Sequence, residues 1–211
     1  MIARHLNVTK STKPKDIQDC LQIRFAERIS YKVAQECHLR LIDGDLGTQQ
    51  RLYELLPAYK TLLESTVPGV HVALERDMHG RFLRMFVSPP QAAESFSRFR
   101  RIVSMDGTFI KTRFIQTLLI AVALDANGHL YPIAWALVES ENGSSWEWFL
   151  NHLKWAIPVL GTQTVTLLSD CDKGLIPAIP HALPLARQAH CCHHLCENFT
   201  TKFGRALQPQ F

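Results

Sequence analysis

Two aspartates that each follow a short apolar stretch are the residues best suited to chemistry. "RIVSMD" ends at Asp106 and "TVTLLSD" ends at Asp170. Each stretch is typical of a β-strand, and a helical crossover between them would return the second strand parallel to the first. Both carboxylates would then emerge at one edge of the sheet, where open α/β sheets bind ligands. Carboxylates gathered in this way suit Mg²⁺ or Mn²⁺, and a pair of ions can bracket the oxygens of a phosphoryl transfer.

Each aspartate also has an interpretation that involves no chemistry. Asp106-Gly107 between β-forming residues is a strong signal for a hairpin turn, which local sequence alone favours. Asp170 could simply cap the helix that follows it. Neither alternative predicts that one sheet brings both residues together, so the joint pattern is what favours a cation site.

The elements expected around these aspartates form an α/β fold with a mixed sheet flanked by helices. Strands are predicted at 101–106, 112–125, 129–140 and 164–170. The first three are joined by short turns and should be antiparallel, and the fourth should lie parallel to the first. A helix is predicted after the third strand, where Ser144 and Glu147 would form a capping box. Its apolar stripe comprises Trp146, Phe149, Leu150, Leu153 and Ile157.

Residues 1–101 are predicted to be a basic helical N-terminal region with a β-hairpin at about 70–87, and the domain boundary is placed before residue 102. In this region Lys and Arg outnumber Asp and Glu, whereas residues 102–211 are nearly neutral. Two predicted helices joined by a short turn could act as a helix-turn-helix on DNA. The alternative is a solvated helical face that packs on the other domain. The basic residues on or between these helices are Lys13, Lys15, Arg24, Arg28 and Lys32.

The composition points to a soluble chain in a reducing compartment. The sequence has 211 residues, a net charge of +4 and six cysteines. It starts without an apolar leader and has no apolar run of membrane-spanning length. We therefore expect no secretory signal, no transmembrane segment and free thiols.

The order of four motifs resembles the transposase domain of Mutator-like elements (MULE transposases). The motifs are "SMDGT", "ESENGSSWEWF", "SDCDKGL" and "CCHHLCENF", spread over about 102–204. The front half, with "KPKDIQ" and "ISYKVAQEC", also resembles what precedes that domain. The resemblance implies a DDE-type transposase with an RNase H-like fold, in which Asp106 and Asp170 are the first two catalytic, metal-binding carboxylates. It also implies Mg²⁺ or Mn²⁺ as cofactor, and transposon ends and target DNA as partners. It further implies a nuclear location and allows a homo-oligomer.

The third carboxylate of such a triad is a Glu on a helix well downstream of the second Asp. The acidic residues after Asp170 are Asp172 and Glu197, and neither matches that position. Glu139 and Glu141 follow the third strand and are alternatives, although the family does not use acidic residues there as the third ligand. We therefore expect a C-terminally incomplete, truncated transposase domain that is inactive as this fragment.

The segment "HCCHHLCENF" crowds cysteines and histidines onto one predicted helix. Cys191, His194 and Asn198 share a face and match the family's Cys-x-x-His…Asn pattern, so we expect them to line the site. Zinc would need two further ligands and is not expected. The opposite face is apolar and is interpreted as core packing. That face comprises Cys192, Leu195, Cys196, Phe199 and Phe203.

These observations leave three functions open, and they do not decide whether the chain is an enzyme. The first is metal-dependent phosphodiester cleavage and strand transfer in DNA transposition. The second is a domesticated DNA-binding or transcription-regulating protein without catalysis, as some plant relatives of the family are. The third is a gene fragment without function.

Overall fold

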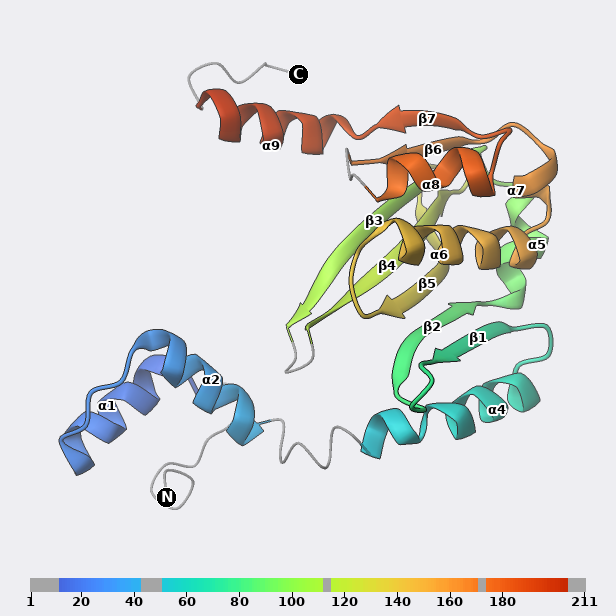
Figure 1. Cartoon of the computed structure of the whole chain (residues 1–211). Coiled ribbons are helices and arrows are strands. Elements are labelled where there is room, and N and C mark those ends of the chain that lie inside the picture. The colour runs from blue at the N-terminus through green and yellow to red at the C-terminus, as the bar shows by residue number, and fades with distance from the viewer. Residues whose placement is uncertain (1–11, 43–50, 112–114, 171–173, 205–211) are drawn as a thin grey trace. The chain divides into compact units, whose positions relative to one another are not determined.

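The computed structural model describes residues 12–42, 51–111, 115–170 and 174–204. The chain divides into two compact units (Figure 1). The first comprises residues 1–56 and 111–114, and the second comprises residues 57–110 and 115–211. Within the described ranges, no helix has both the length and the apolar character needed to cross a membrane.

The first unit is built on a pair of packed helices, α1 (Pro14–Phe25) and α2 (Tyr31–Ile42). Ile17 of α1 and Ala34 of α2 are fully buried. Ala26 ends α1 in the left-handed conformation, at φ 55°, which turns the chain out of the helix. Ser30 then caps α2, because its hydroxyl accepts a hydrogen bond from the Val33 N–H at 3.3 Å. The predicted pair of helices is confirmed.

The second unit contains a seven-stranded mixed sheet in the order β1-β2-β5-β4-β3-β6-β7 (Figure 1). The pairs β1/β2, β2/β5 and β4/β5 are antiparallel, whereas β3/β6 and β6/β7 are parallel. The strands are β1 (His71–Arg76), β2 (Phe82–Ser88), β3 (Ile102–Lys111), β4 (Ile115–Leu124), β5 (Leu130–Val138), β6 (Thr166–Ser169) and β7 (Arg187–His190). The predicted mixed α/β architecture, with its fourth strand parallel to its first, is therefore confirmed.

The helices of this unit supply much of its core. They are α4 (Leu56–Thr66), α5 (Pro90–Phe96), α6 (Gly143–Ala156), α7 (Val159–Thr162), α8 (Leu175–Ala182) and α9 (Cys192–Phe203). The predicted apolar stripe of α6 is confirmed, since all five of its members are buried. The stripe packs in one cluster with sheet residues such as Phe86 and Leu167 and with α8 residues such as Ile179. Burial of this apolar surface is what holds the helices on the sheet.

The predicted capping box of Ser144 and Glu147 is wrong. Helix α6 begins at Gly143, and its N-cap is Asn142, whose side chain accepts a hydrogen bond from the Ser145 N–H at 2.9 Å. Asn142 has the extended backbone that an N-cap needs, so the helix starts before Ser144 can take that position.

The hairpin predicted at about 70–87 is present as β1 and β2. It pairs with β5 through β2, so the sheet includes strands from both sides of residue 101. The compact second unit begins at Pro57, and the division of the chain before residue 102 stays a prediction.

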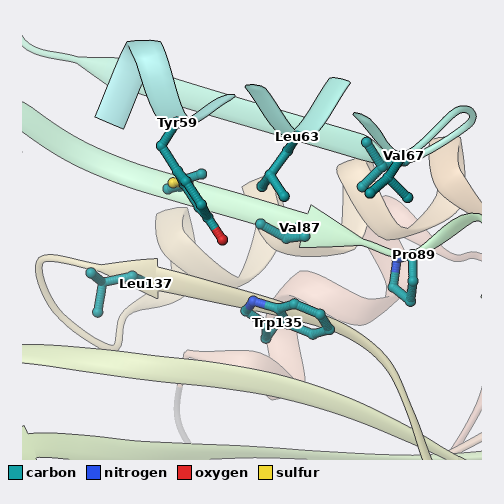
Figure 2. A pocket seen from close by; sticks show the side chains of 9 residues that line it. Tyr59, Leu63, Val67, Val87, Pro89, Trp135 and Leu137 are labelled. Atoms are coloured by element: carbon teal, nitrogen blue, oxygen red, sulfur yellow. The ribbon is translucent and has the colours of Figure 1, made fainter. Parts of the chain in front are cut away.

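An apolar pocket of about 280 Å³ lies between α4 and strands β2 and β5 (Figure 2). Trp135 and Leu137 point into it from β5, whereas their neighbours Ala134 and Ala136 are buried in the core. This alternation places α4 and α6 on opposite faces of the sheet. The pocket is lined by Tyr59, Leu63, Val67, Val70, Met85, Val87, Pro89, Trp135 and Leu137. None of these residues is acidic, so the pocket is distinct from any carboxylate site.

Two histidines join β1 to α6. The Nε2 atom of His71 lies 3.0 Å from Nδ1 of His152, and the rings of Phe86 and Trp155 pack against His71. Burial, followed by the charge of His152, lowers the pKa of His71 to about 4. Burial also lowers the pKa of His152. The pair therefore favours the neutral state of both imidazoles.

We predict that the free energy of unfolding falls as the pH drops from about 6.5 to about 4. In this window the unfolded chain binds a proton at residue 71 that the folded chain resists, so protonation favours unfolding. The contribution is fully present above pH 6.5. The melting temperature, followed by circular dichroism, should fall by a few degrees more across this window in the unmodified chain than in His71→Phe. The exposed His79→Gln should behave like the unmodified chain, and an identical pH dependence in His71→Phe would contradict the assignment.

Candidate active site

The parallel pairing of β3 with β6 sets Asp106 and Asp170 at the same level of the sheet. Ser104 lies opposite Leu168 in this pairing. Two residues further along both strands, the same register reaches Asp106 and Asp170. The predicted parallel crossover between the two strands is therefore confirmed, while the meeting of the two carboxylates and their roles in binding and catalysis stay predictions.

The alternative interpretations of the two aspartates are wrong. Strand β3 continues through Asp106-Gly107 to Lys111, so the Asp-Gly pair is not a hairpin turn. Strand β3 lies between β4 and β6 in the sheet, and its membership of the sheet overrides the local turn signal. Asp170 does not cap the following helix either, because the N-cap of α8 is Gly174.

Asp106 and Asp170 differ in their surroundings. Asp106 is exposed, and its Oδ1 accepts a hydrogen bond from the Gly107 N–H at 2.9 Å. Asp170 follows the last residue of β6 directly and is half-buried. The hydroxyl of Ser169 donates to the Asp170 carbonyl at 2.8 Å, which fixes the backbone where the strand ends.

Strand β7 adds Cys191 to the same level. Ser169 lies opposite His190 in the parallel pairing of β6 with β7, so Asp170 and Cys191 are next in register. The Cys191 N–H donates to the Ser169 carbonyl at 2.7 Å. Three neighbouring parallel strands thus carry Asp106, Asp170 and Cys191 to one edge, where helix α9 begins.

The rest of the cysteine–histidine segment lies on α9. His194 is half-buried and Asn198 is exposed. Within the described part of the chain, the Nδ1 atom of His194 is shielded from solvent and has no hydrogen-bond partner. Across the same residues, no three His, Cys, Asp or Glu side chains are grouped so that they could hold a metal ion. The placement of His194 and Asn198 as site-lining residues stays a prediction.

The interpretation of the second face of α9 as core packing is wrong. No residue of this helix is buried, and Leu195 and Phe203 are 43% and 51% exposed. The apolar periodicity of α9 predicts an amphipathic helix correctly, but the described part of the chain does not cover its apolar face.

Glu141, one of the two alternatives named for the third carboxylate, makes contacts that local sequence patterns do not predict. Its carboxylate carbon lies 2.6 Å from the position that a Cβ atom of Gly107 would occupy. Its Oε1 accepts a hydrogen bond from the indole N–H of Trp146 at 3.2 Å. Glu139, by contrast, is exposed. Two sequence features relate to this contact: the glycine next to Asp106, and the tryptophan five residues after Glu141. Neither feature predicts the contact between Glu141 and Gly107 without the fold.

The donor set fits an oxygen-preferring divalent cation in kind. Asp106 and Asp170 offer carboxylate oxygens, which are the ligands that Mg²⁺ and Mn²⁺ prefer. Two other acidic residues have different surroundings. Glu147 is exposed on α6, and Glu197 pairs with His193 at 3.4 Å. Asp172 lies outside the described residues.

The five basic residues proposed to contact DNA belong to the first unit and are all exposed. Arg28 donates from Nε to Gln22 Oε1 at 2.9 Å, which ties the link between α1 and α2 back to α1. The remaining four are Lys13, Lys15, Arg24 and Lys32. Exposure is consistent both with DNA contact and with a solvated helical face.

Comparison with known proteins agrees with the motif pattern. Residues 102–198 match the family model described as the MULE transposase domain. The chain is 24% identical over 182 residues to "Protein FAR-RED IMPAIRED RESPONSE 1" of Arabidopsis thaliana. The aligned segment covers 85% of this chain and 21% of that protein. It is 30% identical over 110 residues to "Transposase for insertion sequence element IS905" of Lactococcus lactis, which covers 50% of this chain and 27% of that protein. The chain thus spans about a quarter of the length of these relatives.

Replacement of Asp106 should leave the fold intact, because its side chain is exposed. We predict that Asp106→Ala changes the free energy of unfolding by less than about 1 kcal/mol. The adjacent Met105 is 2% exposed, so Met105→Ala should lower the free energy of unfolding by about 2–5 kcal/mol. Urea denaturation of both variants measures this contrast. Equal destabilisation would show that Asp106 has a structural role.

Proposed function

We propose, from the match of residues 102–198 to the MULE transposase domain, that the chain is a transposase-derived protein in which Asp106 and Asp170 cleave and join DNA phosphodiesters with a divalent cation. The observation that carries the proposal is the parallel register of β3 and β6, which brings both aspartates to one level. A family match alone would say nothing about whether this chain retains that arrangement.

The strand order supports an RNase H-like fold for the domain. Strands β3, β4 and β5 are consecutive neighbours, and after the crossover through α6, β6 and β7 continue the sheet in parallel on the other side of β3. Asp106 thus lies on the central strand of these five, and Asp170 directly follows the strand beside it. This is the placement that the resemblance to DDE transposases implies.

The two carboxylates would hold Mg²⁺ or Mn²⁺, which supplies a Lewis acid for the phosphodiester when bound. Asp106 and Asp170 would orient the reacting phosphate against the edge. Cys191 lies at the same level, so its side chain and the first turn of α9 would border the DNA. The phosphate backbone is also the partner expected for the exposed basic residues of the first unit.

A second candidate function is DNA binding without catalysis, at a nuclear location. The observation that favours it is the set of five exposed basic residues on or beside α1 and α2. Binding through these residues would require neither aspartate. The two functions therefore differ in which residues they need.

Cleavage is tested with the full chain on supercoiled plasmid DNA in the presence of Mn²⁺ or Mg²⁺. The proposal predicts conversion to the nicked form, contrary to the expectation from the sequence of an inactive fragment. Asp106→Ala and Asp170→Ala should each reduce this conversion by at least about 100-fold, because each removes a charge from the phosphoryl-transfer site. Glu147→Ala, at an exposed carboxylate of α6, is the matched control and should retain activity. Absence of nicking by the unmodified chain with either cation would overturn the enzymatic proposal.

DNA binding is tested separately by fluorescence anisotropy with a labelled duplex at several salt concentrations. Replacement of Lys13, Lys15 and Lys32 by Gln should weaken binding and make the salt dependence shallower by roughly one unit of slope per lost phosphate contact. Binding by the Asp106→Ala, Asp170→Ala double variant should be retained. Unchanged affinity of the lysine variant would show that the first unit does not provide the DNA contact.

A further inference from the structure

Glu141 connects the core of the second unit to the candidate active site. It lies between strand β5 and helix α6 and is half-buried. The indole N–H of Trp146 donates to its Oε1 at 3.2 Å. Trp146 itself is fully buried and packs edge-on against Phe149, with ring centroids 5.7 Å apart. A rigid, core-anchored donor therefore helps to set the position of the Glu141 carboxylate.

The space for this carboxylate exists because residue 107 has no side chain. A Cβ atom at Gly107 would lie 2.6 Å from the Glu141 carboxylate carbon, which is far inside van der Waals contact. Gly107 does not adopt a positive φ, so its backbone conformation does not require glycine. The close approach of Glu141 is the reason that the structure offers for a glycine at this position.

Gly107 is also the residue that the Asp106 side chain touches. Asp106 Oδ1 accepts from the Gly107 N–H at 2.9 Å, while Glu141 occupies the Cβ side of the same residue. With standard backbone dimensions, these separations place the two carboxylates within about 8 Å of each other, on opposite sides of β3, because consecutive residues of a strand point to opposite faces. At that distance the charge of Glu141 is felt by a cation held at Asp106.

We propose that Glu141 is a positioning residue of the candidate active site: held against Gly107 by Trp146, it supplies a third negative charge that strengthens the binding of a divalent cation at Asp106 and Asp170. This inference rests on the proposed function, because it assumes a cation at that edge. Glu141 comes from the junction of β5 and α6, so it is separate from the downstream glutamate that the family resemblance implies.

The charge of Glu141 is tested by titration of the full chain with Mn²⁺, with free Mn²⁺ followed by electron paramagnetic resonance. Glu141→Gln keeps an oxygen that can accept from Trp146 but removes the charge, so it should raise the Kd for Mn²⁺ about fivefold with an unchanged melting temperature. Glu139→Gln, at the exposed glutamate two residues earlier, should bind Mn²⁺ like the unmodified chain. Equal affinity of Glu141→Gln and the unmodified chain would overturn the proposal.

The contact with Gly107 is tested by a double-mutant cycle. Gly107→Ala should weaken Mn²⁺ binding, because the new methyl group displaces the flexible end of Glu141. In a Glu141→Ala background the same change should have no further effect, since there is no carboxylate left to displace. Additive effects of the two substitutions on the Kd would contradict a role for Gly107 through Glu141.

Asp106→Asn separates failure of this inference from failure of the proposed function. If Asp106→Asn weakens Mn²⁺ binding and Glu141→Gln does not, only the role of Glu141 fails. If the unmodified chain binds no Mn²⁺, or if Asp106→Asn binds it with unchanged affinity, the proposed cation site itself fails, and the role of Glu141 fails with it.

Discussion

The parallel pairing of β3 with β6 is the constraint on which the geometry of the candidate site depends. Strand β6 has only four residues, so its register rests on few contacts. The Thr166 N–H donates to the Arg101 carbonyl at 2.8 Å at one end, and Leu167 and Val103 are both fully buried. A slip of one residue would turn the side chains of β6 to the opposite face and expose Leu167. The apolar core therefore also fixes where the Asp170 carboxylate emerges.

The core and the candidate site share residues on α6. This helix buries Trp146 and Phe149 against the sheet, and the Lys154 ammonium donates to the Ala182 carbonyl of α8 at 2.9 Å. Helix α8 connects β6 to β7, so the packing of α6 on α8 supports the strand before Asp170 in the sequence and the strand after it. Trp146 contributes to both functions at once, because its ring is buried in the core while its N–H reaches Glu141.

The sequence predicts the parts of the fold that depend on periodicity. The alternating strands, the apolar stripe of α6 and the crossover that aligns Asp106 with Asp170 follow from repeated apolar positions and from the handedness of connections. Local signals were less reliable. Asp106-Gly107 has the local signal of a turn, but it lies within the ten-residue strand β3 of the sheet. Ser144 reads as a helix cap, but Asn142 reaches the first-turn N–H before it. Glu141 was one of two acidic alternatives, but its contact with Gly107 could not be predicted, because that contact depends on the folded arrangement of two distant segments.

The close approach of Glu141 to Gly107 also constrains how the sequence can diverge. A side chain at position 107 is sterically acceptable only if residue 141 is shortened or turned away. Conversely, a side chain as long as glutamate fits at position 141 in this conformation only where position 107 is glycine. The two positions are therefore sterically coupled, so a change at one alters the set of residues tolerated at the other. Related chains should vary at these positions together rather than independently.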